Sequence, residues 1–408
     1  MSSLTWSGRL LGATIPLAAS LLAAPVLAQS PVVPLTQSDA VSRALGVADW
    51  RATGEGRRDA ARAAADGVRR FDNPSVEMRR GSLNGPAEDE TEWEVEAVQT
   101  VDLTGRRSSL RRAAEAEADA VELDVLRADQ ERAAEVRRAW VGCAAASEKA
   151  VAARDFHSRL VGVERIVQAR TDAGDVAIYD LRRMRVEVRT AEADAAVADA
   201  EVGAACAELA VLTDVRGARA AGPLRAPTPT DGAALDRPDV GARERRLAAA
   251  GQQVSAADRS RLPEVEVGVG WKRVETLGFE ADGPQFTIGL TLPLFDHGSA
   301  RVRQARAEER AAAADLVLAR REAEGEVAAA SARVDGMLTA LAAASATRED
   351  ADRLGSIAQA AYEAGEGDVT ELVDAYRAAH AADLFIIELT GRANLAVIEL
   401  DLARGVNP

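Results

Sequence analysis

One apolar pattern occurs twice in this chain, 191 residues apart. Residues 176–213 carry apolar side chains at spacings that alternate between three and four, which is typical of a helix packed along another helix. The positions are Leu181, Met184, Val188, Ala191, Ala195, Ala198, Val202, Ala205, Leu209 and Leu212. Adding 191 to each number gives a second apolar series: Leu372, Ala375, Ala379, Ala382, Ile386, Leu389, Ala393, Ala396, Leu400 and Ala403. The chain is therefore a tandem duplication whose unit contains a long coiled-coil helix.

The composition agrees with long packed helices. Of the 408 residues, 47% are hydrophobic but only 3% are aromatic, and much of the apolar content is alanine. Such a composition is typical of helices that pack closely rather than of a compact mixed core. The formal net charge of −15 argues against nucleic acid as a partner. It is compatible with cationic solutes, although an acidic surface commonly serves solubility alone.

Residues 1–28 have the features of a secretory signal peptide. Arg9 supplies the positive charge, residues 10–22 are mostly apolar, and Val26-Leu27-Ala28 ends in the small-residue pattern that signal peptidase cuts. We expect the mature protein to begin at Gln29, where no cysteine is present to carry a lipid anchor. No later stretch has the ~18–20 uninterrupted apolar residues of a membrane helix. The exported protein is therefore expected to be either soluble or a β-barrel.

Each copy is predicted to contain a helix, two strands and a hairpin of long helices. The first copy spans 29–213, with a helix to about residue 70 that breaks near 54–56, strands at 75–81 and 92–103, and a hairpin at 105–213. The second copy spans 239–408, with a helix to about residue 260, strands at 264–274 and 285–294, and a hairpin at 298–408. Residues 214–238 contain four prolines and no periodicity, so they are expected to be a linker.

The four strands predict an outer-membrane barrel shared between subunits. Each strand is mainly apolar on one face and mainly polar on the other, and the twelve residues of 92–103 extend over ~40 Å, enough to cross an outer membrane when tilted. Four strands cannot close a barrel, and an open sheet edge is not tolerated in lipid. Two chains would supply eight strands and three chains twelve. The alternative is a soluble periplasmic coiled-coil protein with a small sheet.

The ensemble of motifs resembles the TolC family of outer-membrane efflux channels, and most of all its heavy-metal (CzcC-type) branch. The resemblance covers nearly the whole chain after residue 28, and four segments carry it: 101–107, 174–181, 292–298 and 362–375. It implies a mainly α-helical homotrimer with a twelve-stranded β-barrel in the outer membrane and a long α-helical barrel in the periplasm. The implied partners are a periplasmic adaptor protein, an inner-membrane RND-type pump and outer-membrane lipid.

The resemblance implies a passive exit duct for a tripartite efflux system, with heavy-metal cations as a candidate cargo. A type I secretion duct of the same fold remains an alternative. A non-channel alternative is a periplasmic adaptor or structural protein, since adaptors also contain a coiled-coil hairpin. An adaptor, however, normally inserts one hairpin between β-rich halves, whereas this chain has two hairpins in tandem.

The resemblance also places a gate and a docking tip at the turns of the two hairpins. The implied gate residues at the pore entrance are Tyr179, Asp180, Tyr362, Glu371 and Asp374. The implied adaptor-docking tip is Ala173, Gly174, Asp175, Ala364, Gly365 and Glu366. Acidic groups that converge from several chains repel one another and attract cations. Alternatively, these acids only face water near helix N-termini, where carboxylates are favoured. The family's basic gate residue corresponds here to Gly367.

Five glutamates are expected to face the barrel lumen, where an acidic lining would favour the passage of cations. They are Glu92, Glu94, Glu96, Glu264 and Glu266. The alternative is that they provide only the polar lining that any barrel lumen has.

The two cysteines lie at matching positions of the first hairpin. Cys143 is 31 residues before Gly174 and Cys206 is 32 residues after it, so they should face each other in an oxidising compartment. Helix axes usually lie ~8–10 Å apart, whereas a disulfide needs Cα atoms within ~7 Å. The sequence therefore leaves open whether the two thiols are bonded.

No pattern of catalytic, cofactor-binding or metal-binding residues is present. The three histidines, His157, His297 and His380, lack metal-ligand spacing. No nucleophile elbow or phosphate-binding loop occurs. We expect a protein that is not an enzyme and that holds no cofactor.

Overall fold

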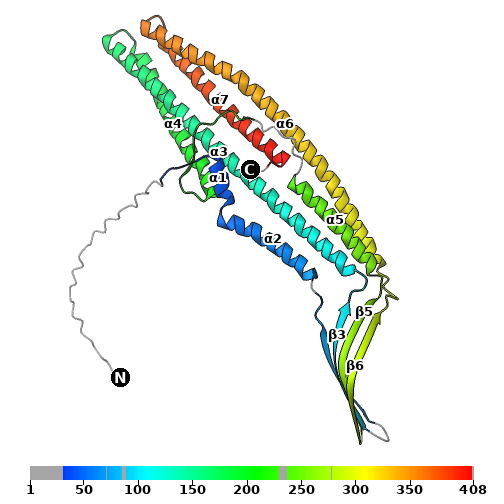
Figure 1. The fold of residues 1–408 in the computed structure, drawn as a ribbon. Coiled ribbons are helices and arrows are strands. Elements are labelled where there is room, and N and C mark those ends of the chain that lie inside the picture. Colours follow the sequence, from blue (N-terminus) through cyan, green and yellow to red (C-terminus); the bar gives the residue numbers. More distant parts are fainter. Residues whose placement is uncertain (1–30, 70, 85–88, 229–236, 277, 407–408) are drawn as a thin grey trace, which may run out of the picture. The chain divides into compact units, whose positions relative to one another are not determined.

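Two long helical hairpins and a four-stranded sheet form the computed structural model (Figure 1). The structure describes residues 31–69, 71–84, 89–228, 237–276 and 278–406. The expected signal peptide, residues 1–28, lies outside this part. Residues 32–408 form one unit, which is described here by itself.

From the helix that directly precedes the strand hairpin onward, the elements occur in the same order in both halves of the chain, as the duplication predicts. The first half contains β1 (Val33–Leu35), α1 (Gln37–Leu45), α2 (Ala48–Arg69), β2 (Ser75–Asn84), β3 (Asp89–Val101), α3 (Arg106–Ala173) and α4 (Ile178–Thr213). The second half contains α5 (Pro238–Arg259), β5 (Glu264–Thr276), β6 (Phe279–Thr291), α6 (Ser299–Ala364) and α7 (Val369–Arg404), preceded by the short β4 (Ala218–Ala220).

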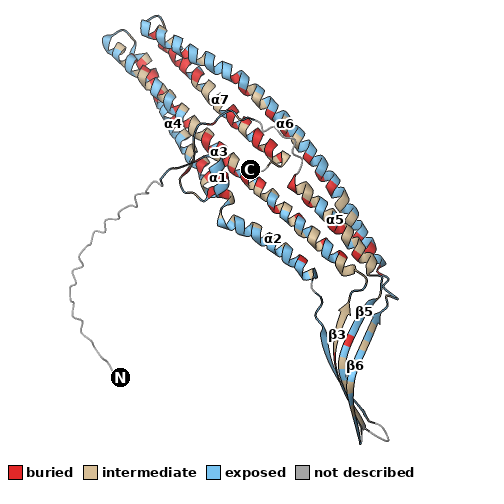
Figure 2. Cartoon of the chain, viewed as in Figure 1, coloured by how far each residue is buried: buried red, intermediate tan, exposed pale blue. Residues whose placement is uncertain are grey.

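Both hairpins turn at a glycine with positive φ. Gly174 ends α3 at φ 85° and Gly365 ends α6 at φ 78°, a conformation that glycine adopts without steric cost. Buried residues line the facing sides of the helices (Figure 2). Among the described helices, only α6 is long and apolar enough in composition to cross a membrane. It is alanine-rich and packs along α5 and α7.

The expected break near 54–56 is wrong. The helix is interrupted earlier, where Gly46 caps α1 and donates to the carbonyl oxygens of Ser42 and Arg43. Gly54 lies inside α2, and a Cβ at this position would lie 3.2 Å from Cγ1 of Val125 on α3. The glycine that looked like a helix breaker therefore allows α2 to approach α3 closely.

The strand boundaries also differ from those expected. The polar segments 82–91 and 275–284 are expected to be loops between the strands, but their described residues largely continue the strands. Cross-strand pairing extends to Asn84 opposite Asp89 and to Thr276 opposite Phe279. At the other end, β6 stops at Thr291 rather than at residue 294. A polar face does not distinguish a hairpin loop from the end of a strand, and backbone pairing determines which of the two forms.

The segment 214–238 is more than a linker, because it contains β4. This strand pairs in parallel with β1, with Val33 opposite Ala218 and Leu35 opposite Ala220. Nε1 of the buried Trp140 donates to the carbonyl oxygen of Leu35 at 2.8 Å. Both strands have three residues, too few for an alternating pattern to be recognised in the sequence.

The four long strands form an antiparallel sheet in the order β2-β3-β5-β6. The duplication extends to the register of this sheet. In the first hairpin Ser75 lies opposite Val98, and adding 191 to both numbers gives Glu266 and Gly289, which lie opposite each other in the second hairpin. The two strand hairpins therefore correspond residue for residue. Within the described chain, β2 and β6 are the two edges of the sheet.

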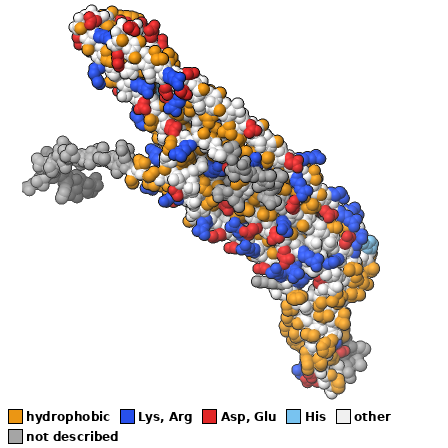
Figure 3. All heavy atoms as spheres, turned by 45° about the horizontal axis from the view of Figure 1, so that its top comes forward, with side chains coloured by type: hydrophobic (Ala, Val, Ile, Leu, Met, Phe, Trp, Pro, Cys, Tyr) orange, Lys and Arg blue, Asp and Glu red, His pale blue; other side chains and the backbone are white. Residues whose placement is uncertain are grey.

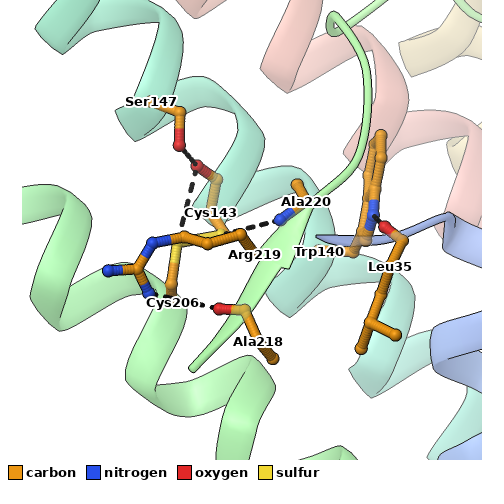
Figure 4. The surroundings of a disulfide bond; sticks show 8 residues. All are labelled: Leu35, Trp140, Cys143, Ser147, Cys206, Ala218, Arg219 and Ala220. Carbon is orange, nitrogen blue, oxygen red and sulfur yellow. Dashed lines mark hydrogen bonds between the residues drawn. A yellow bond between two sulfur atoms is a disulfide. The ribbon is translucent and has the colours of Figure 1, made fainter. Parts of the chain in front are cut away.

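A disulfide joins α3 to α4 (Figure 4). Cys143 and Cys206 are fully buried, and their Cα atoms are 4.7 Å apart. The backbone N–H of Ala220, on β4, lies 3.3 Å from Sγ of Cys143. Because Cα atoms lie ~2.3 Å from a helix axis, this Cα separation is compatible with the usual ~8–10 Å between axes. The sequence could not establish that the two Cα atoms lie within disulfide range.

Removing this cross-link should lower the stability of the helical body. At the equivalent positions of the second copy, 191 residues later, stand Val334 and Val397, both buried. A Cys143→Val/Cys206→Val variant should therefore retain packing while freeing a loop with a sequence separation of 63 residues. We expect the free energy of unfolding to fall by about 2–4 kcal/mol. Denaturant titration followed by helical circular dichroism measures this loss, and oxidised wild type unfolding at the same midpoint as the variant would contradict it.

Candidate functional site: a membrane-facing sheet and a helical entrance

One face of the sheet is apolar and open to its surroundings. Ile288 is 80% exposed and Phe286 is 78% exposed. Cross-strand rows on this face continue the pattern: Val76, Ala97, Val269 and Phe286 form one row, and Met78, Val95, Trp271 and Pro284 form the next. Figure 3 shows hydrophobic side chains gathered over the strands, whereas charged side chains are interspersed over the helices. An exposed apolar band of this kind is typical of a surface that contacts lipid.

The apolar band ends near the strand turns in a row of tryptophan and charged side chains. The guanidinium of Arg80 lies 4.7 Å from the ring centre of Trp93, and Nε1 of Trp271 donates to Asp282 at 3.1 Å. Arg273 forms an ion pair with Glu275 at 2.9 Å. Tryptophan and arginine are the residues expected where a barrel wall passes from hydrocarbon into the polar headgroup region.

The opposite face of the sheet is polar and carries all five glutamates that the sequence assigned to the lumen. Strand alternation places Glu92, Glu94, Glu96, Glu264 and Glu266 on this face. Two basic residues that the sequence analysis did not single out accompany them. Arg79 lies 2.7 Å from Glu77 and 4.0 Å from Glu94, and Lys272 lies 3.0 Å from Glu92. Part of the acidic charge on this face is therefore neutralised within the sheet.

Asp102 fixes the passage from β3 into α3. Its carboxylate accepts hydrogen bonds from the backbone N–H groups of Thr104 at 2.9 Å, Gly105 at 3.1 Å and Arg107 at 2.6 Å. Burial alone would raise the pKa of Asp102, but these hydrogen bonds and one from the Thr104 hydroxyl outweigh it, so the pKa is lowered. Gly105 adopts φ 73° at this point. Asp102 and Gly105 thus fix the backbone conformation between β3 and α3.

At the helical tip, Tyr362 is packed between the two hairpins. It is 3% exposed, and the guanidinium of Arg170, on α3, lies 4.7 Å from its ring centre. Nη2 of Arg170 also donates to the carbonyl oxygen of Tyr362 at 3.1 Å. Burial is the main factor that raises the pKa of the Tyr362 phenol. The implied gate residue Tyr362 therefore contacts the first hairpin.

The other implied gate residues have different environments. Asp374 forms an ion pair with Arg377 at 3.1 Å, and Arg377 also pairs with Glu187 on α4. Glu371 takes part in a capping box with Asp368 at the start of α7. Tyr179 is 70% exposed and Asp180 is partly buried. The six implied tip residues, Ala173, Gly174, Asp175, Ala364, Gly365 and Glu366, are exposed.

The basic partner of Asp374 is thus Arg377 on the same helix, whereas the family resemblance placed the basic gate residue at the position of Gly367. Arg377 was not predicted from the sequence, although its spacing of three residues from Asp374 is a recognisable helical ion-pair signal. Its second contact, to Glu187, depends on how the two hairpins pack and has no local signal. Arg183 similarly donates to Thr370 across the hairpins at 3.2 Å.

The described part of the chain contains no group of three or more His, Cys, Asp and Glu side chains that could hold a metal ion. His380 instead stacks on Phe156 with a ring-centre separation of 4.6 Å. Burial is the main factor that lowers the pKa of His380.

Comparison with known proteins shows what this chain, with its apolar sheet face and paired long helices, is similar to. Residues 231–406 match the family described as outer membrane efflux protein. The second copy of the repeat therefore matches this family. The resemblance drawn from the sequence motifs is thereby confirmed, and the segment matched is the second copy with the end of the linker. No curated protein matches the chain significantly.

Solved structures share the fold over nearly the whole efflux protein. A membrane protein from Pseudomonas aeruginosa is 23% identical, with a TM-score of 0.76, over 92% of this chain and 91% of that chain. CusC, which forms a transmembrane channel, is 19% identical with a TM-score of 0.76, over 92% of this chain and 93% of its own. The MtrE outer membrane channel of Neisseria gonorrhoeae is 19% identical with a TM-score of 0.73, over 90% and 88%.

The family and the fold agree on where this efflux protein acts. It is an outer-membrane protein whose long helices extend into the periplasm, and it serves as an efflux channel. The apolar face of the sheet is the surface that an outer-membrane location requires, and the mainly helical fold class with barrel strands is confirmed.

Proposed function

We propose that three copies of this efflux protein form a passive exit duct that works with a periplasmic adaptor and an inner-membrane RND-type pump. The observation that carries the proposal is a four-stranded sheet with an apolar, exposed face and two edge strands, β2 and β6. In lipid these edges must be paired. Pairing β6 of one copy with β2 of the next would close a ring, and three copies, the number that the family resemblance implies, would give twelve strands.

The duplication predicts the register of that contact. Within one chain β3 pairs with β5, which joins the two copies of the repeat, with Ala97 opposite Val269. Adding 191 to Ala97 gives Ile288 on β6, and subtracting 191 from Val269 gives Met78 on β2. The same pairing between subunits would therefore place Ile288 of one subunit opposite Met78 of the next. In this register all of β2 lies against residues 282–291 of β6, and apolar side chains face the same side of the sheet on both strands.

A Met78→Cys/Ile288→Cys variant tests this assembly. Opposite residues of an antiparallel pair have Cα atoms ~4.5–5.5 Å apart, within the range of a disulfide. The native cysteines are buried and already paired, so they should not interfere. Oxidation should give a covalent trimer on a non-reducing gel. A Met78→Cys/Phe286→Cys variant, on the same face but two residues out of register, should cross-link much less. A product that stops at dimer would contradict the proposed number of subunits.

The charge of the polar face supports cations as cargo. In the proposed assembly this face lines the lumen, and Glu77, Glu92, Glu94, Glu96, Glu264 and Glu266 outnumber Arg79 and Lys272 on it. We infer that heavy-metal cations are exported. A deletion strain should be hypersensitive to zinc, cobalt, cadmium or copper, with tolerance restored by the gene. Sensitivity to drugs with unchanged metal tolerance would retain the duct and exclude this cargo.

We further propose that the contacts between the hairpin tips hold the periplasmic entrance closed. Arg377 connects Asp374 on α7 to Glu187 on α4, and Arg377→Ala removes both contacts at once. We expect its single-channel conductance in planar bilayers to rise about twofold or more, because the two hairpins are no longer tied together at the entrance. The matched control is Arg353→Ala, since Arg353 pairs only along α6 with Glu349 among the described residues. Equal conductance of Arg377→Ala and wild type would exclude a role in closure.

A further inference from the structure

We propose that Glu96 is a transient cation-binding site in the barrel wall and sets the preference of the lumen for cations. The inference rests on the proposed exit duct and assigns a specific role to one of the lumen-facing acids. Glu96 lies near the middle of β3, on the polar face, and is 5% exposed. Its Oε1 is buried and has no hydrogen-bond partner in the part of the chain that the structure describes.

Two glycines on the neighbouring strand create the space that this carboxylate occupies. A Cβ at Gly268 would lie 2.2 Å from Oε1 of Glu96, and a Cβ at Gly270 would lie 2.5 Å from the carbonyl oxygen of Val95. The side chain therefore lies directly against the backbone of β5. Any other residue at position 268 would displace the carboxylate, so Glu96 can lie against β5 because both positions are glycine.

Most other acids on the same face have positive partners. Glu92 pairs with Lys272 at 3.0 Å, Glu264 pairs with Arg106 at 2.9 Å, and Arg79 serves both Glu77 and Glu94. Glu94 also accepts a hydrogen bond from Gln285 at 2.9 Å. Glu266 is exposed, so water can solvate it. Glu96 combines burial with the absence of an ion pair among the described residues.

A buried carboxylate with an unsatisfied oxygen is unfavourable unless a positive charge or water compensates it. Because Oε1 itself is enclosed against β5, a cation in the lumen would supply that charge from the small exposed part of the Glu96 side chain, without contacting Oε1. Because no cluster of three metal-binding side chains occurs in the described chain, one carboxylate would hold the cation together with the water of its hydration shell. Such binding is weak, and weak binding is what conduction requires, since the cation must also leave. In the trimer, three such sites would lie at one height.

Conductance of the reconstituted trimer in planar bilayers tests the proposal, with K⁺ as the permeant cation and Co²⁺ as the probe. Wild type should conduct K⁺ in preference to Cl⁻, and millimolar Co²⁺ should reduce the K⁺ current. Glu96→Gln should lower the K⁺-to-Cl⁻ permeability ratio by about fivefold and abolish the Co²⁺ block. The matched control, Glu55→Gln, removes one negative charge from α2, where Glu55 is exposed and pairs with Arg51, and should behave as wild type.

The outcomes distinguish failure of the Glu96 site from failure of the proposed exit duct. A conducting Glu96→Gln channel with the wild-type permeability ratio and Co²⁺ block would overturn the role of Glu96 and leave the exit duct intact. Absence of conductance from both wild type and the Arg377→Ala variant would overturn the duct itself, and the site with it. If Glu96→Gln does not assemble, Glu96→Asp keeps the charge but withdraws the carboxylate from Gly268. It should weaken the Co²⁺ block, and an unchanged block would overturn the site.

Discussion

Replacing Gly270 with alanine should prevent the sheet from assembling in the outer membrane. A Cβ at this position would lie 2.5 Å from the carbonyl oxygen of Val95 and 3.1 Å from Cα of Glu96. Both are backbone atoms of β3, so no side-chain rotation can relieve the contact, and β3 and β5 must separate. These two strands join the first repeat to the second. Overpacking of this kind costs about 1–3 kcal/mol at each site, and a trimer would contain it three times.

We expect the amount of outer-membrane trimer to fall by about tenfold or more, measured by membrane fractionation and gel electrophoresis of unheated samples. Gly283→Ala provides the matched control. Gly283 belongs to β6 of the same sheet, and nothing lies within 4 Å of the Cβ that it would gain. Its trimer should form at the wild-type level. Normal assembly of Gly270→Ala would show that β3 and β5 are not paired as described.

An arginine at Ile288 should also abolish stable insertion, for a different reason. Ile288 is 80% exposed near the centre of the apolar face, which in the membrane would contact lipid hydrocarbon. Arginine on the lipid face of a barrel costs about 2–4 kcal/mol near the bilayer centre, and three subunits would triple this cost. We expect heat-resistant trimer to be lost from the outer-membrane fraction.

The control for this charge is Gln285→Arg, three residues earlier on the same strand. Gln285 lies on the polar face and donates to Glu94, so an arginine there gains an acidic partner and avoids lipid. Its trimer should remain in the membrane. If Ile288→Arg and Gln285→Arg assembled equally well, the two faces of the sheet would not differ in environment, and the lipid-facing assignment would be wrong.

Long-range periodicity made most of the helical fold predictable. The heptad positions around Leu181 and Leu372 predict α4 and α7, and Gly174 and Gly365 mark both turns because few other residues adopt positive φ. Features that depend on tertiary contact were not accessible. Gly54 could not be distinguished from a helix breaker without the neighbouring Val125, and β4 is recognisable only through its pairing with β1.

The candidate site likewise has one part that the sequence predicts and another part that depends on tertiary contacts. Strand alternation is enough to place Glu92, Glu96 and Glu266 on one face, because a strand has a period of two. The partners of these acids depend on register: Lys272 neutralises Glu92 only because β5 pairs with β3 in one particular alignment. The isolation of Glu96 depends further on the two glycines opposite it. Such cross-strand relations leave no trace in the local sequence.

The matching registers of the two strand hairpins bear on the origin of the chain. A gene encoding a single repeat would specify one strand hairpin and one helical hairpin, and six identical copies would supply the same twelve strands. Fusion of two such genes released each half from the requirement to be identical. The positions of Cys143 and Cys206 illustrate this divergence, since their counterparts Val334 and Val397 fill the equivalent space without a covalent bond. A sixfold ancestor would have placed every feature six times around the axis, whereas the fused chain, in the proposed trimer, places a disulfide, or a buried carboxylate, only three times.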